Sequence, residues 1–200
     1  MPTFEESVAA GGRQVGPVRN DPIEVVDADP AWPARFAEMR ARLTEALGPT
    51  ARRIDHVGST AVPGLAAKPI VDIQLSVPDV EDEAAYLAPV EACGFVLRFT
   101  EPGHRYFRPP PGLPRMWQVH VCTIGSLWER DHLLFRDHLR AHPDEAAAYG
   151  WLKRELAPRF ATDRIAYTDA KDPFIHRALE RAETWARMTG WTVAAQSEGR

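Results

Sequence analysis

Residues 54–77, IDHVGSTAVPGLAAKPIVDIQLSV, hold most of the side chains whose types and spacing could support chemistry. Gly58, Ser59 and Thr60 follow a predicted short strand and form a turn, in which backbone N–H groups and two hydroxyls can bind an anion. Glycine at such a turn lets a ligand approach the backbone closely. Isolated turns of this composition are usually only turns, so a site is indicated only if further polar residues lie nearby.

Two charged residues follow this turn closely. Lys68 is a point charge suited to phosphate, and Asp72 lies on the polar side of a predicted strand over residues 70–77. A carboxylate facing a phosphate is unfavourable alone, but Mg²⁺ is usually held by one or two carboxylates together with substrate phosphates. The combination predicts a nucleotide or phosphoester site with Mg²⁺ or Mn²⁺. The alternative is a solvent-facing acid on an edge strand.

A second alternating segment, residues 116–124, adds a histidine. Gln118, His120 and Cys122 alternate with apolar residues, so His120 is predicted to lie on the same kind of polar face as Asp72. Imidazole titrates near neutral pH, which suits a metal ligand or a general base. The alternative is a structural histidine bonded within the sheet, and the sequence does not show whether the two strands are neighbours.

Four other residues are considered for ligand contact. Arg105, in a predicted strand over 104–108, could bind a phosphate or carboxylate, or could be a solvated strand charge. Tyr167 and Lys171 precede a predicted helix start at residues 172–173, where backbone N–H groups favour an anion. Lys153 lies on a late helix and is predicted to belong to a solvated face.

The elements that must position these residues follow from hydrophobic spacing. Apolar residues three and four apart predict helices at about residues 32–47 and 79–93, and three more after residue 127. Alternating runs predict strands, and these lie at residues 23–26, 52–57, 70–77, 95–99, 104–108 and 116–124. The order predicts an α+β fold: a twisted mixed sheet with helices on one face and a helical C-terminal third.

The length of 200 residues suggests a single domain, predicted over residues 21–190. Residues 1–20 and 191–200 lack periodicity and are predicted to be flexible tails. The net charge of −4 argues against nucleic acid as the main partner, but not against a nucleotide. The sequence has no signal-peptide pattern and no long apolar run, so we expect no membrane span and a cytoplasmic location.

The run HVGSTAVPGLAAKPIVDI closely resembles the signature of the GrpB family of bacterial proteins. The similarity extends to DPAWPARF before it and to GFVLRF, QVHVCTIGS and YTDAKDPFI after it, over about residues 23–186. This resemblance implies a nucleotidyltransferase-like fold of the DNA polymerase β type. Family members that are fused to dephospho-CoA kinase point to nucleotide or coenzyme A metabolism.

The wider superfamily places a Gly-Ser turn before a strand with two acids, and a third acid on a neighbouring strand, to hold two metal ions. Carried over by position, the turn falls on Gly58 and Ser59 and the first acid on Asp72. The second acid falls on Gln74, and the third on the strand that offers His120. The resemblance therefore implies Asp72 as a metal ligand, with Gln74 and His120 as further positions, and leaves two-metal catalysis without its full set of carboxylates.

The leading hypothesis is a metal-assisted nucleotidyltransferase, or a related phosphoryl-group transferase, that uses a nucleoside triphosphate and a small-molecule acceptor. Asp72 and His120 would be catalytic. The phosphate ligands would be drawn from the other predicted residues, which are Gly58, Ser59, Thr60, Lys68, Arg105, Tyr167 and Lys171. The alternatives are a non-catalytic nucleotide- or coenzyme-binding module that has lost the acids, and a protein-interaction domain without a ligand.

Overall fold

A six-stranded mixed sheet forms the centre of the computed structural model, which describes residues 4–16 and 21–194. The strand order is β1-β4-β5-β6-β3-β2, and only β3 and β6 pair in parallel. The strands are Arg13–Gln14 (β1), Arg53–Val57 (β2), Val71–Val77 (β3), Val96–Glu101 (β4), His104–Arg108 (β5) and Trp117–Thr123 (β6).

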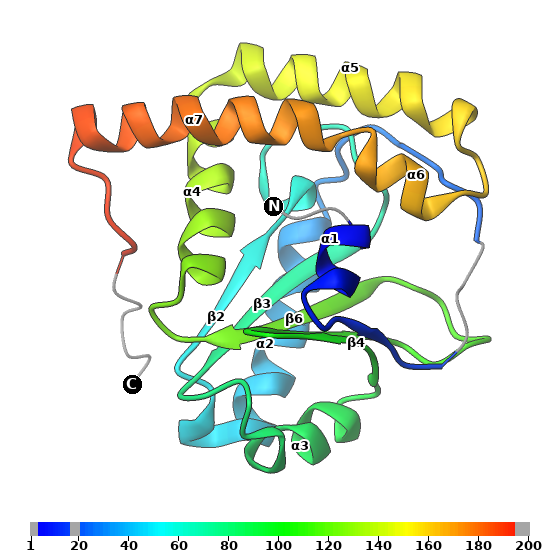
Figure 1. Ribbon diagram of the computed structural model, residues 1–200, viewed down its shortest axis with the longest axis vertical. Helices are drawn as coiled ribbons and strands as arrows, with labels where there is room; N and C mark the ends of the chain where they lie inside the picture. Colours follow the sequence, from blue (N-terminus) through cyan, green and yellow to red (C-terminus); the bar gives the residue numbers. More distant parts are fainter. Residues whose placement is uncertain (1–3, 17–20, 195–200) are drawn as a thin grey trace.

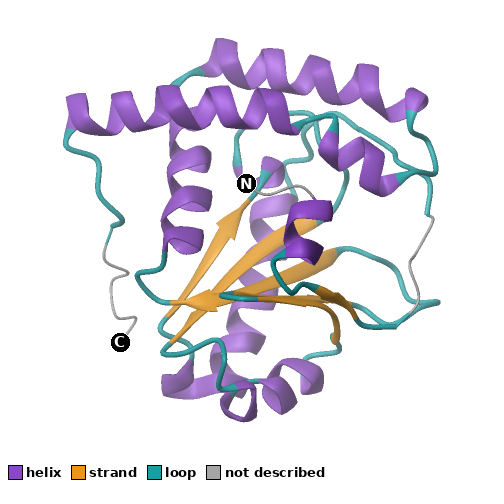
Figure 2. Cartoon of the chain, in the orientation of Figure 1, coloured by secondary structure: helices purple, strands orange, loops and turns teal. Residues whose placement is uncertain are grey.

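Helices lie on both sides of the sheet (Figure 1; Figure 2). Two of them, α2 and α3, pack on one face, and the helices from α4 onward gather on the other side. Their bounds are Phe4–Ala9 (α1), Trp32–Leu47 (α2), Leu87–Ala92 (α3), Leu127–Ala141 (α4), Pro143–Arg159 (α5), Arg164–Asp169 (α6) and Asp172–Thr189 (α7). Short 3₁₀ turns occupy Gly48–Thr50, Ser59–Ala61 and Glu83–Ala85. Within the described ranges, no helix combines the length and apolar character needed to cross a membrane.

Strand β3 separates an apolar from a polar face, as its alternation predicts. Val71, Ile73, Leu75 and Val77 are fully buried and pack with residues of α2 such as Leu43. The opposite face of β3 carries the polar residues, and the parallel pairing with β6 extends that polar face across the sheet. The register sets Asp72 beside Gln118, Gln74 beside His120 and Ser76 beside Cys122.

The predicted α+β fold class is confirmed, but helices cover both faces of the sheet rather than the one face that was expected (Figure 1). A turn at residues 58–60 leads from β2 toward an antiparallel strand that carries Asp72, and the next strand, β6, runs parallel to it. This is the arrangement that the nucleotidyltransferase resemblance implied. The C-terminal third is helical, and α4, α5 and α7 share a core built on Leu139, Tyr149 and Ile175.

Both predicted tails contact the folded chain where the structure describes them. Strand β1 pairs with β4 at the sheet edge, and the Val15 N–H donates to the Arg98 carbonyl. At the other end, the Trp191 indole N–H donates to Asp137, and Arg53 donates to the Ala194 carbonyl. Residues 1–3, 17–20 and 195–200 lie outside the described part of the chain.

Two predicted elements are shorter than expected. The proposed strand at residues 23–26 is only a bridge between Val26 and Ala67, because that segment pairs with a loop rather than with the sheet. The helix predicted over residues 79–93 is limited to α3, in which Pro89 occupies the first turn. Proline is tolerated there, since the first N–H groups of a helix have no intrahelical partner.

Candidate functional site

The glycine turn and Asp72 converge in the structure. Gly58 directly follows β2 and has a φ of 68°, and Asp72 lies opposite Val57 in the pairing of β2 with β3. A Cβ atom added to Gly58 would lie 2.3 Å from Oδ2 of Asp72, so no other residue fits without displacing the carboxylate. The close approach predicted for this glycine is therefore made to the protein's own acid.

Asp72 is held in its ionised form by its neighbours. Its side chain is 23% exposed, the Gln118 amide donates to Oδ1, and Nε2 of His120 lies 3.7 Å from the same oxygen. Burial raises the pKa of Asp72, but the contacts with His120 and Gln118 and the charge of Lys68 outweigh burial and lower the pKa. Asp72 is thus a partly exposed carboxylate at the junction of two strands.

The amide of Gln118 has a fixed orientation. Its Oε1 accepts from the Tyr106 hydroxyl at 2.7 Å and from Arg115 at 2.6 Å, which leaves the amide N–H₂ group directed at Asp72. The residue beside Asp72 on β6 therefore acts as a donor to the carboxylate. An acid at this position would instead repel Asp72 unless a cation lay between them.

All three lysines of the chain surround this carboxylate, although all its other basic residues are arginines. Nζ of Lys153 donates to Oγ of Ser59 at 2.7 Å, and Lys153 is only 4% exposed. Lys68 and Lys171 lie over the Tyr167 ring, at 5.4 and 4.8 Å from its centroid. Residues 68, 153 and 171 are called the lysine cluster below.

The lysine cluster carries positive charge that the protein only partly balances. Burial lowers the pKa of all three amines, and the charge of Lys171 lowers the pKa of Lys68 and Lys153 further. Asp72 raises the pKa of each amine, yet every net shift is downward. A bound anion with several negative charges would reverse this penalty, so the arrangement suits a polyphosphate better than a single carboxylate.

The predicted ligand residues Ser59, Lys68, Tyr167 and Lys171 are brought together, and Lys153 joins them. The prediction that Lys153 is solvated is wrong. Its helix spacing could not show which face of α5 is covered, but a signal was available in the sequence. Only three of the 24 lysine and arginine residues are lysines, and lysine differs chemically from arginine. The rarity of lysine in this chain is the signal that could have directed attention to residue 153.

Two predicted phosphate ligands do not face Asp72. The Thr60 hydroxyl is hydrogen-bonded to Nε2 of His56 at 2.9 Å and is buried, so Thr60 braces the turn. Arg105, the second of these residues, is engaged by two carboxylates on the opposite face of the sheet. It alternates with the polar-face residues of β5, and its guanidinium is held by Glu81 and Glu83, the latter at 2.6 Å.

Gln74, the position of the second acid, is fully buried, and both of its amide atoms lack a hydrogen-bond partner within the described residues. Residues 4–16 and 21–194 contain no group of three or more His, Cys, Asp or Glu side chains arranged to hold a metal ion. Of the predicted ligands Asp72, Gln74 and His120, only Asp72 supplies a carboxylate. The donor set therefore does not fit a two-metal centre.

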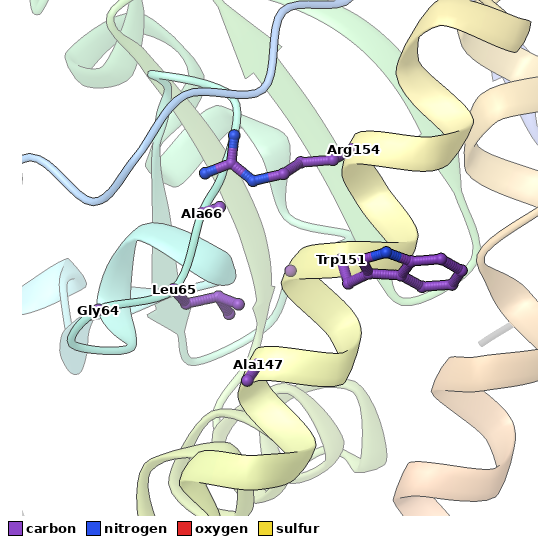
Figure 3. A pocket seen from close by; sticks show the side chains of 7 residues that line it. Gly64, Leu65, Ala66, Ala147, Trp151 and Arg154 are labelled. Atoms are coloured by element: carbon purple, nitrogen blue, oxygen red, sulfur yellow. The ribbon is translucent and has the colours of Figure 1, made fainter.

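A surface pocket of about 280 Å³ lies between the 64–66 loop and α5 (Figure 3). Arg154 reaches from α5 toward Ala66, whereas the Trp151 ring points to the other side of the helix. The pocket lining, which also includes Gly64, Leu65, Ala147 and Gly150, contains neither Asp72 nor a lysine. This pocket is therefore separate from the candidate site.

Comparison with known proteins identifies the family. The family model described as GrpB protein matches residues 22–181. The chain belongs to the GrpB family. A UPF0157 protein of Pseudomonas aeruginosa is 46% identical over 168 residues, which cover 82% of this chain and 69% of that protein. The crystal structure of the conserved protein GrpB from Enterococcus faecalis has 33% sequence identity and a TM-score of 0.70, and covers 81% of this chain and 99% of that one.

A dephospho-CoA kinase of Mycolicibacterium paratuberculosis is also similar, with 35% identity over 196 residues. The match covers 85% of this chain but only 48% of the kinase, so this GrpB protein spans about half the kinase's length. The family resemblance read from the sequence is confirmed by these matches.

Proposed function

We propose that this GrpB protein binds a nucleoside triphosphate, or another small molecule with a polyphosphate group, at the lysine cluster. The observation that carries the proposal is the convergence of all three lysines of the chain on Ser59 and Asp72. Three amines near one carboxylate, of which Lys153 is buried and the other two are partly buried, leave a net positive charge. A polyphosphate supplies the compensating charge together with several acceptor oxygens. The partial exposure of Asp72 supports access by a ligand.

The reaction that fits these residues is transfer of a nucleotidyl or related phosphoryl group to a small acceptor. An acceptor hydroxyl placed next to His120 would lose its proton to Nε2 as its oxygen forms the new bond to phosphorus. The bond from phosphorus to the leaving phosphate breaks, and the lysine cluster stabilises the departing negative charge. Asp72, 3.7 Å from His120, stabilises the imidazolium that results.

The proposed reaction does not require two Mg²⁺ or Mn²⁺ ions, because Gln74 and Gln118 occupy positions where carboxylates would be needed to hold them. A single divalent ion that arrives with the substrate phosphates stays a prediction. Asp72 would be its protein ligand, and the ion would supply additional positive charge to the phosphates. The binding experiment below varies this ion directly.

A non-catalytic nucleotide- or coenzyme-binding module is the second candidate function. It is favoured by the donation of the Gln118 amide to Asp72, which occupies one oxygen of the only carboxylate in the donor set. In this case the lysine cluster would bind the same phosphates without turnover. The two candidates therefore differ in the fate of the ligand and agree on where it binds.

Calorimetric titration with each of four nucleoside triphosphates, with Mg²⁺, with Mn²⁺ and with EDTA, tests the binding step. We expect Lys153→Met to weaken binding by about tenfold or more, since a charged hydrogen bond is lost. Arg154→Met is the matched control, because Arg154 is the next residue on α5 and pairs with Asp27 instead. Equal affinities in the wild type and Lys153→Met would overturn the assignment.

Chemical labelling gives an independent measure, because the chain has only three lysine side chains to modify. Acetylation followed by mass spectrometry should show protection of Lys68, Lys153 and Lys171 by the nucleotide that binds. Release of pyrophosphate or phosphate with pooled acceptors then separates the transferase from the binding module. Absence of binding to all four nucleotides, with and without the metals, would contradict both.

A further inference from the structure

Arg115 is a half-buried arginine that lies beside the candidate site and contacts only neutral groups. It belongs to the loop before β6, and its Nη2 donates to the Tyr106 hydroxyl at 2.5 Å and to Oε1 of Gln118 at 2.6 Å. Gln118 in turn donates to Asp72. A single side chain therefore separates the Arg115 guanidinium from the carboxylate of the site.

The other two nitrogens of this guanidinium have no acceptor. Nε and Nη1 of Arg115 are buried and make no hydrogen bond within the part of the chain that the structure describes. Arg53, which is also shielded from solvent, instead pairs with the Asp55 carboxylate at 2.9 Å. Burying a charged donor without an acceptor is unfavourable, and arginine cannot escape this cost by losing its proton. Arg115 thus has hydrogen-bonding capacity that the described residues leave unused.

Arg115 and Lys153 lie on opposite sides of Asp72. Lys153 is fixed near the end of β2 by its bond to Ser59, and Arg115 is fixed near the start of β6 by its bond to Gln118. These positions share one end of the sheet, because β2 is antiparallel to β3 and β3 is parallel to β6. Since β3 lies between β2 and β6, the two sides are two strand spacings apart, or about 10 Å.

Lys68 connects the two sides electrostatically. Burial lowers its pKa most, and the charges of Lys171 and then Arg115 lower the pKa of Lys68 further. The positive groups therefore extend from the lysine cluster across Asp72 to β6. A single phosphate group is smaller than this span, whereas a chain of linked phosphates can follow it.

We propose that Arg115 binds the phosphate chain of the ligand at the end opposite Lys153, so that the site selects a triphosphate over a diphosphate or a monophosphate. The inference rests on the proposed polyphosphate-binding function and adds to it a fourth cation and a preference for chain length. Arginine suits this role because its N–H groups form charge-assisted hydrogen bonds with phosphate oxygens and its charge is permanent.

A purely structural role of Arg115 predicts a different result. If Arg115 only oriented Gln118 toward Asp72, its removal would change the affinity for every phosphate ligand to a similar degree. If Arg115 binds the far end of the chain, the loss of affinity grows with the number of phosphates. The dependence on chain length therefore separates the two roles.

Calorimetric titration with inorganic orthophosphate, pyrophosphate and tripolyphosphate, at one ionic strength, measures this dependence without a nucleobase. We expect the affinity of the wild type to increase with each added phosphate. Arg115→Met should weaken tripolyphosphate binding by about ten- to 100-fold, as expected when a charge-assisted hydrogen bond is lost. Its affinity for orthophosphate should stay close to that of the wild type, because the lysine cluster can hold one phosphate alone.

Arg40→Met is the matched control. Arg40 is exposed on α2, which packs on the apolar face of the sheet, so this substitution removes the same charge far from the site. Arg115→Lys keeps the charge but has fewer donors, and it should lose less tripolyphosphate affinity than Arg115→Met. Thermal unfolding shows whether each variant folds. Should Arg115→Met not fold, Arg115→Lys decides, since its loss for tripolyphosphate must exceed its loss for orthophosphate.

Unchanged tripolyphosphate affinity in Arg115→Met, or an equal loss for all three ions, would overturn the assignment of Arg115. If Lys153→Met weakens tripolyphosphate binding and Arg115→Met does not, the lysine cluster stands and only its extension to β6 fails. Failure of the proposed function is distinguishable, because the wild type would then bind neither tripolyphosphate nor any of the four nucleoside triphosphates, which would overturn both proposals.

Discussion

The two faces of strand β3 differ in what they contribute, although their residues alternate along one segment of chain. The face toward α2 carries Val71, Ile73, Leu75 and Val77, all fully buried in one apolar core. The opposite face carries an ionised acid, a buried amide that has no partner in the described part of the chain, and amines nearby whose pKa values are lowered. One face stabilises the fold, and the other holds charge that a ligand can neutralise, as is common at functional sites.

The largest effect on the free energy of unfolding is expected when a core side chain on the apolar face is removed. Leu75→Ala removes a fully buried leucine from the apolar face and should lower the free energy of unfolding by about 2–5 kcal/mol. Urea denaturation measures this loss, and nucleotide affinity of the folded fraction should not change. A loss well below 1 kcal/mol would show that the apolar face of β3 is not the stabilising one.

Each face also has a buried histidine that makes stability depend on pH. Burial lowers the pKa of His56, stacked on Phe36 of α2, to about 4, and that of His104 on the polar face also to about 4. The unfolded chain binds these protons near the ordinary pKa of 6.5 and the folded chain does not. Stability is therefore complete above pH 6.5 and falls as the pH drops toward 4, by up to roughly 3 kcal/mol for each histidine.

Denaturation between pH 6.5 and 5, where the carboxylates remain ionised, measures this slope. His56→Gln keeps a hydrogen-bonding partner for Thr60 and removes one titrating group, so its slope should be clearly smaller than that of the wild type. His104→Gln should reduce the slope similarly from the other face. Identical slopes in all three proteins would contradict the assignment of neutral, buried imidazoles.

Much of the contrast between the faces could be predicted from the sequence, because alternation has a period of two and assigns every second residue of a strand to one face. The parallel pairing of β3 with β6 could not, since register between distant segments depends on tertiary packing. The same limit explains Arg105. Its place opposite His104 and Tyr106 follows from alternation within β5, but which face of β5 adjoins Asp72 depends on the pairing with β6.

The part of the site that is contiguous in the sequence was predicted, and among its distant residues Lys153 was missed. The turn at residues 58–60 and Asp72 lie within 15 residues of each other, and local chemistry was enough to connect them. Lys153 lies 94 positions from Ser59, and only the packing of α5 brings the two into contact. Lys153 lies between Leu152 and Arg154, and the local helix pattern does not separate a buried amine from a solvated one.

The turn at Gly58 lies at the edge of the polar face and tests whether its contact with Asp72 is strained. Gly58→Ala adds the cost of a positive φ and a clash with Asp72, so we expect a loss of about 2–3 kcal/mol in the free energy of unfolding. Gly64→Ala is the control, because Gly64 has a φ of 76° but open space around its Cα, and should cost only about 1 kcal/mol. Equal losses would mean that the Gly58–Asp72 contact carries no strain of its own.

The smallest effect is expected at Gln74, where the polar face is closed to solvent. Its amide is fully buried with neither atom paired in the described residues, so Gln74→Leu removes a desolvation cost and keeps a similar volume. We expect the free energy of unfolding to stay within about 1 kcal/mol of the wild type, with any change toward greater stability. Nucleotide affinity with Mn²⁺ should be unchanged, because the Gln74 side chain is fully buried. A marked loss of Mn²⁺-dependent affinity in Gln74→Leu would instead return this residue to the site and extend the functional part of the polar face inward.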